Sequence, residues 1–68
     1  MTNAEIKLKL KSKSVNDLYN EFKDSENFLL VESENPQNLN SGKVVFEFYG
    51  CNVVFENNNL TTLIYKNI

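Results

Sequence analysis

Few side chains in this 68-residue chain could take part in catalysis. The sequence contains no His, no Trp and no Arg, and its single cysteine is Cys51. The missing residue types supply most general-base catalysis, most transition-metal ligation and most bidentate recognition of phosphate. No histidine is available to activate the thiol of Cys51. We therefore expect Cys51 to be a small structural residue in a turn beside the core. We therefore predict that the protein is not an enzyme and that it has no cofactor and no metal site.

The other polar residues form no recognisable catalytic motif. The nine carboxylates could supply a pair of catalytic acids, but such a pair needs a deep cleft, which a domain of this size rarely forms. Two isolated glycines cannot build a phosphate-binding loop, and the acidic residues lack the spacing of a calcium loop. The chemistry that remains is non-covalent binding.

A row of lysines near the N-terminus is the first candidate for a binding surface. Residues 5–11 alternate strictly between charged and apolar side chains, which is the pattern of a half-buried strand. On a strand the lysines would lie ~6.6–6.8 Å apart on one face, close to the phosphate spacing of a nucleic-acid strand. This spacing gives the alternative function, a small nucleic-acid-binding module that uses Lys7, Lys9, Lys11 and Lys13. No aromatic residue interleaves these lysines, and lysines on an edge strand commonly protect it from aggregation, so we favour a solvated face.

An acidic row is the second candidate. Asp17, Glu21 and Asp24 follow an i, i+4, i+7 spacing, which places them on one side of a helix about 5–6 Å apart. A protein that mimics DNA would present such a row, which Glu26, Glu32 and Glu34 could extend. The simpler interpretation is a solvated helix exterior.

Hydrophobic periodicity predicts a single small α+β domain over residues 1–68. The expected fold is an antiparallel sheet of four to five strands in the order β-α-β-β-β-β, with one helix packed on one face. The helix is expected over residues 14–24, with Ser14 as its N-cap and an apolar stripe that consists of Val15, Leu18, Tyr19 and Phe22. The strands are expected at residues 5–11, 28–33, 43–49, 53–56 and 60–65, with the main loop at 34–42 and turns at 50–52 and 57–59. Thr2 and Glu5 form a capping-box pattern, so a short N-terminal helix is the alternative to the first strand.

The segment from 43 to 56 has apolar residues on both faces. Val44, Phe46 and Phe48 would share one face, and Val45 and Tyr49 the other. One helix can cover only one face, so the second face predicts a partner. We expect either a homodimer or a target protein, with Val45 and Tyr49 in the contact.

These observations together predict a binding protein. The net charge of −2 does not suggest a polybasic nucleic-acid binder, and no apolar stretch is long enough to cross a bilayer. A lone cysteine and the lack of a targeting segment indicate the cytoplasm. Lysine in place of every arginine, with twelve asparagines, is typical of AT-rich genomes such as those of many phages and mobile elements. We expect a phage or mobile-element inhibitor that occupies a surface of a host protein, either by DNA mimicry or through its sheet.

Overall fold

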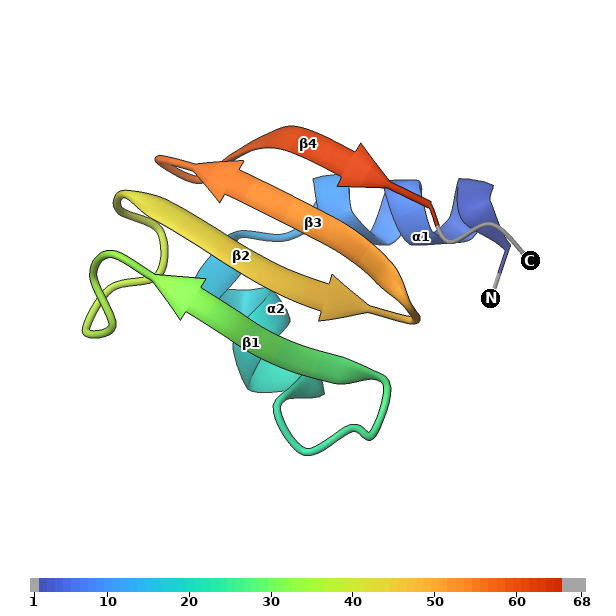
Figure 1. Ribbon diagram of the computed structural model, residues 1–68, viewed down its shortest axis with the longest axis horizontal. Coiled ribbons are helices and arrows are strands. Elements are labelled where there is room, and N and C mark those ends of the chain that lie inside the picture. The colour runs from blue at the N-terminus through green and yellow to red at the C-terminus, as the bar shows by residue number, and fades with distance from the viewer. Residues whose placement is uncertain (1, 66–68) are drawn as a thin grey trace.

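The chain forms two helices followed by a four-stranded sheet (Figure 1). The computed structural model describes residues 2–65. Its elements are α1 (Asn3–Ser12), α2 (Val15–Phe22), β1 (Phe28–Ser33), β2 (Lys43–Phe48), β3 (Cys51–Glu56) and β4 (Asn59–Ile64). All neighbouring strands are antiparallel and follow the order β1-β2-β3-β4, and both helices lie behind the sheet in the view of Figure 1. The predicted α+β class and antiparallel sheet are confirmed, but the chain begins with a second helix.

The N-terminal segment is helical, so the predicted strand at residues 5–11 is wrong. The Thr2 hydroxyl accepts a hydrogen bond from the Glu5 N–H, and the Glu5 carboxylate accepts one from the Thr2 N–H. This reciprocal capping box satisfies two N–H groups at the start of α1 that have no partner within the helix. Leucine, lysine, alanine and glutamate are strong helix formers, whereas lysine and alanine are depleted in strands. Capping and propensity therefore outweigh the alternating pattern.

The helical twist separates residues that a strand would have aligned. Ile6 and Leu10 lie one turn apart and are buried, whereas Leu8 points away from the core and is 72% exposed. At 100° per residue, Lys7 and Lys11 lie on one flank of this buried stripe and Lys9 lies on the other, whereas Lys13 follows the helix as its extended C-cap residue.

Helix α2 matches the predicted helix and begins at the predicted cap. The Ser14 hydroxyl accepts a hydrogen bond from the N–H of the third helical residue at 3.2 Å. Two edge-to-face aromatic contacts join the helix to the sheet. Tyr19 meets Phe28 at 5.9 Å between ring centroids, and Phe22 meets Phe48 at 4.8 Å.

The core draws apolar residues from both helices, the central strands and the long loop. In β2 and β3 every second residue is buried, as the period of a strand requires. Leu39 adds a buried side chain from the loop, which hydrophobic periodicity did not predict. The buried set consists of Ile6, Leu10, Val15, Leu18, Leu39, Val44, Phe46, Phe48, Cys51, Val53 and Phe55.

Two tight turns with left-handed backbone connect the last three strands. Tyr49 and Gly50 have φ values of 51° and 79°, and Asn57 and Asn58 have values of 50° and 68°. Such two-residue turns match the twist of antiparallel strands. Asparagine adopts this conformation readily, but a bulky residue such as tyrosine does so at a cost. Tyr49 therefore belongs to the turn and not, as predicted, to the preceding strand.

Candidate functional site

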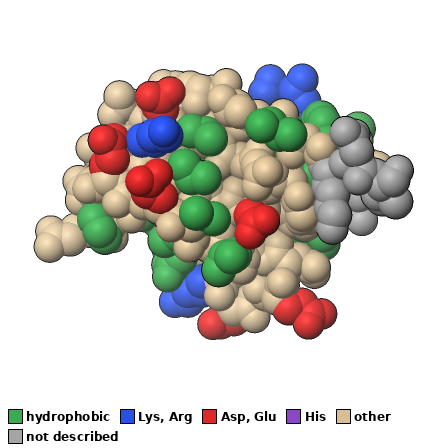
Figure 2. All heavy atoms as spheres, viewed as in Figure 1, with side chains coloured by type: hydrophobic (Ala, Val, Ile, Leu, Met, Phe, Trp, Pro, Cys, Tyr) green, Lys and Arg blue, Asp and Glu red, His purple; other side chains and the backbone are tan. Residues whose placement is uncertain are grey.

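The sheet face opposite the helices carries the largest group of exposed apolar side chains in the part of the chain described. Three of the four large hydrophobic residues that are exposed lie on it: Leu29, Val31 and Ile64, each 56–57% exposed. The half-buried Val45 and Val54 lie opposite each other on β2 and β3 and continue the group. Figure 2 views this face and shows hydrophobic side chains in a line across the strands. We call these five residues the open-face patch.

The strand register places the open-face patch along two adjacent cross-strand rows of the sheet. One cross-strand row consists of Glu32, Val45, Val54 and Thr62, and the adjacent row consists of Leu29, Glu47, Asn52 and Ile64. Val31 is the additional residue where the register of β1 shifts between Leu30 and Glu32. The open-face patch therefore spans all four strands, with polar side chains at defined places within it.

The charges on this face are mainly negative. Glu32 and Glu47 lie within the two rows, and Glu47 is half-buried between Leu29 on β1 and Asn52 on β3. Lys43 is the one lysine on a described strand, and it lies opposite Glu56. A surface that covers this face must therefore provide apolar contacts and positive charge.

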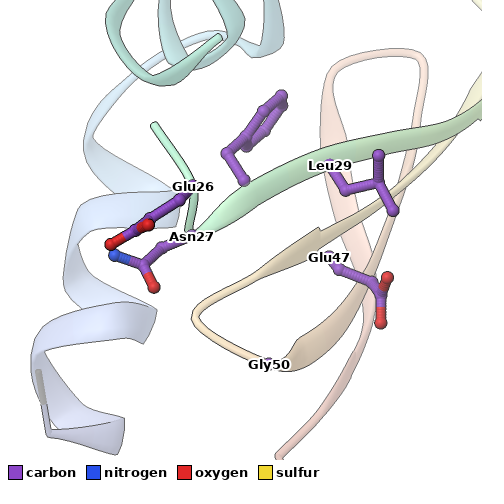
Figure 3. Close-up of a pocket in the computed structure, with 6 residues that line it drawn as sticks. Glu26, Asn27, Leu29, Glu47 and Gly50 are labelled. Atoms are coloured by element: carbon purple, nitrogen blue, oxygen red, sulfur yellow. The ribbon is translucent and has the colours of Figure 1, made fainter. Parts of the chain in front are cut away.

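A hollow of about 250 Å³ lies at the end of β1 beside the open-face patch (Figure 3). Two carboxylates line it, those of Glu26 and Glu47, together with Asn27, Leu29 and Gly50. Figure 3 shows that the two glutamate side chains extend in different directions. The hollow does not bring these carboxylates together as a pair of catalytic acids.

The two apolar residues predicted to bind a partner occupy different places. Val45 lies at the centre of the open-face patch. Tyr49 lies in the turn after β2, about 13 Å further along the chain by strand geometry. Its ring packs edge-on against Phe48 at 4.8 Å, and its N–H donates to the carbonyl of Asn27 at 2.8 Å. The structure therefore places Val45, but not Tyr49, within the patch.

The two charged rows meet each other. Asp17, Glu21 and Asp24 are exposed on α2 and the turn that follows it. The Glu21 carboxylate forms ion pairs with the ammonium groups of Lys13 at 3.5 Å and Lys9 at 3.9 Å. The middle of the acidic row is thus partly neutralised, and half of the lysine row is engaged. An exposed ion pair contributes little stability, but this arrangement differs from the unbroken charge of a DNA strand.

The remaining lysines of the row lie elsewhere. Lys7 and Lys11 line a groove between α1 and β4, whose other wall includes Leu60, Leu63 and Tyr65. The helix therefore presents two lysines, and not four, along this groove.

Asparagine side chains hold the start of α2, a role that the sequence did not predict. The first three N–H groups of a helix have no acceptor within it. Here Val15 N–H donates to Asn58 Oδ1 at 2.9 Å, Asn16 N–H donates to Asn40 Oδ1 at 2.9 Å, and the third donates to Ser14. Asn16 in turn accepts a bond from the Leu39 N–H at 2.9 Å. Residues up to 43 positions apart are joined in this way, so these donors are already occupied and unavailable to an anion.

Cys51 is the first residue of β3 and not, as predicted, part of a turn; it is 2% exposed, so its thiol faces the core. Within residues 2–65 no three His, Cys, Asp or Glu side chains are grouped as a metal site would require. Neither α1 nor α2 has the length and apolar character needed to span a membrane.

Comparisons of this chain with protein families, curated proteins and solved structures found no significant match.

Proposed function

We propose that this protein is a small non-catalytic binding module that covers a surface of another protein with the open face of its sheet. The observation that carries the proposal is the open-face patch, in which five apolar side chains lie on one face across four strands without an element of the described chain above them. Large exposed apolar patches with polar residues around them are typical of protein interfaces. The burial of this face in a complex would remove it from water.

The partner that we propose is a different protein with a basic rim. If two copies paired through this face, Glu32 and Glu47 of both would lose water near each other, and the described strands of each copy would offer only Lys43 in return. Burial of unpaired like charges is costly. Arginine or lysine on a partner would instead pair with these carboxylates and favour association. The homodimer predicted through Val45 and Tyr49 is the alternative occupant of the same face.

The composition of the chain supports a biological setting for this interaction. We propose a phage or mobile-element inhibitor that acts on a host protein in the cytoplasm. Asp17, Glu21 and Asp24 could act by DNA mimicry, but the ion pairs of Glu21 support the open face as the stronger candidate.

A matched pair of substitutions tests the proposal. Leu29→Glu places a charge in the open-face patch, and Leu8→Glu makes the same change at an exposed leucine on α1. Tagged wild-type protein and both variants are used to capture partners from a lysate of the source cell. We expect one stoichiometric protein to be retained by wild type and Leu8→Glu and lost by Leu29→Glu. Equal capture by both variants would refute the open face as the interface.

Light scattering decides between a different partner and a second copy. We expect a mass near the 7.9 kDa of one chain at micromolar concentration. A mass of two chains that Leu29→Glu returns to one would assign the face to a homodimer. Charge reversal at Asp17, Glu21 and Asp24 should leave capture intact, and loss of capture there would support DNA mimicry instead.

A further inference from the structure

A groove lies between α1 and β4, on a different side of the molecule from the open face. Two adjoining hollows of about 250 and 340 Å³ form it, and both are lined by Lys11 and Leu60. One hollow extends to Tyr65 and the other to Asn58, and together they are lined by every residue of β4 except Ile64. A six-residue strand is about 20 Å long, which gives the groove room for an extended segment.

The groove is basic in a protein of net negative charge. Lys7 and Lys11 lie one helical turn apart on the α1 side, and Lys13 lies at one end. No described residue that lines either hollow is acidic. Lys13 is engaged with Glu21, so Lys7 and Lys11 supply the charge that is directed along β4. An occupant of this groove should therefore carry negative charge.

The opposite wall is the edge of the sheet. Within residues 2–65, β4 pairs with β3 on one side only, so backbone groups on its other side have no strand partner among these residues. An extended peptide can add to such an edge through main-chain hydrogen bonds. The register shift near Thr61, whose hydroxyl donates to the Val54 carbonyl at 3.2 Å, leaves the stretch from Thr62 to Ile64 as the regular part of this edge.

We infer that the groove between α1 and β4 binds an extended acidic peptide segment, which adds as a short strand to β4 and directs carboxylates toward Lys7 and Lys11. This site shares only Ile64 with the open-face patch: its backbone lies in the pairing stretch of β4, and its side chain lies on the open face. Main-chain pairing supplies register, the two lysines select acidic side chains, and the half-buried Leu60 and Leu63 form the apolar floor.

A single-stranded nucleic acid is a poorer fit for the same groove. Proteins that bind single strands stack successive bases on exposed aromatic rings. The aromatic residues that line this groove are Tyr65, which is half-buried, and Phe55, which is 2% exposed. The unpaired main-chain groups of β4, in contrast, can pair with the N–H and C=O groups of a peptide. A nucleotide chain has no such repeating groups.

Titration of the full chain with three defined probes tests this inference. The probes are a hexapeptide of alternating glutamate and threonine, a hexapeptide of alternating lysine and threonine, and an oligothymidine of six nucleotides. Backbone amide shifts are followed by NMR. We expect the acidic peptide to shift the amides of residues 62–64. The double change Lys7→Gln and Lys11→Gln should weaken its binding at least 10-fold. Lys23→Gln, an exposed control beyond α2, and Leu29→Glu on the open face should leave it unchanged.

Three results would overturn the inference. The first is no shift along β4 at millimolar acidic peptide, and the second is equal binding of the basic peptide. The third is tighter binding of oligothymidine, which would assign the groove to nucleic acid. Because Leu29→Glu disables only the open face, failure of the peptide site and failure of the proposed protein interface can be told apart.

Discussion

Replacement of Asn16 by alanine is expected to destabilise the protein by about 2 kcal/mol relative to the same replacement at Asn20. Asn16 uses both ends of its side-chain amide. Its Oδ1 accepts from the Leu39 N–H at 2.9 Å, and its Nδ2 donates to Asn38 Oδ1 at 3.0 Å. Leu39 is 5% exposed, so its N–H has little access to water once the acceptor is removed.

The magnitude follows from these two bonds. A buried N–H without a partner costs about 1–3 kcal/mol, and loss of the exposed bond to Asn38 adds about 0.5 kcal/mol, the low end for a hydrogen bond. Alanine also favours a helix over asparagine by roughly 0.5 kcal/mol. Asn20 is exposed on the same helix, so the propensity gain is common to both variants and cancels in their difference. In a domain of 60–100 residues, 2 kcal/mol lowers the melting temperature by about 8–16 °C.

Thermal and urea unfolding followed by far-UV circular dichroism measure this difference directly. The slope of free energy against urea should be the same in both variants, which shows that the folded and unfolded states remain comparable. If Asn16→Ala and Asn20→Ala agree within about 0.5 kcal/mol, the asparagine contacts do not hold the loop to α2 and the reasoning fails.

Three further perturbations test other parts of the fold. Gly50→Ala should cost about 1–2 kcal/mol because φ at this position is 79°, and an unchanged urea midpoint would contradict the turn geometry. Hydrogen bonds from Thr2 lower the pKa of Glu5 below its ordinary value of 4.5, so the stability that they contribute is present above pH 4.5 and is lost as the pH falls through the lowered pKa. The difference in melting temperature between wild type and Glu5→Gln should therefore shrink between pH 7 and pH 3, and a constant difference would argue against the capping box. Cys51 should react with iodoacetamide on the order of 100-fold more slowly in the folded protein than in urea, and equal rates would show that its thiol is accessible.

The elements from residue 14 onward could be predicted because local signals and tertiary packing agree there. Ser14 caps a helix with a single apolar stripe, and the alternation around Phe46 matches a strand that is buried on one face. The N-terminal segment gave conflicting signals. Its alternation favoured a strand, whereas its cap and its helix propensities favoured a helix that buries Ile6 and leaves Leu8 exposed. The spacing of apolar residues does not by itself show whether the alternation or the cap and helix propensities determine the structure.

The surface was harder to predict than the elements. The unpaired apolar face of the sheet follows from the strand period, which placed Val45 correctly on the side opposite Phe46. Tyr49 could not be placed, because a tyrosine in left-handed backbone contradicts its ordinary preference. The contacts of Asn16 join segments more than 20 residues apart, so local sequence patterns could not predict them.

The helical N-terminus also changes the salt dependence that we expect for nucleic-acid binding. Single-stranded binding loses affinity with a log–log salt slope of about 0.7 per phosphate contact. Four lysines along a strand would give a slope near 2.8, whereas Lys7 and Lys11 alone would give about 1.4. A slope near 2.8 would require Lys9 and Lys13 to leave Glu21, and Glu21→Gln should then strengthen binding. The ion pairs of Glu21 thus make the two charged rows dependent on each other, so a charge change on α2 can alter binding along α1 without any contact with the ligand.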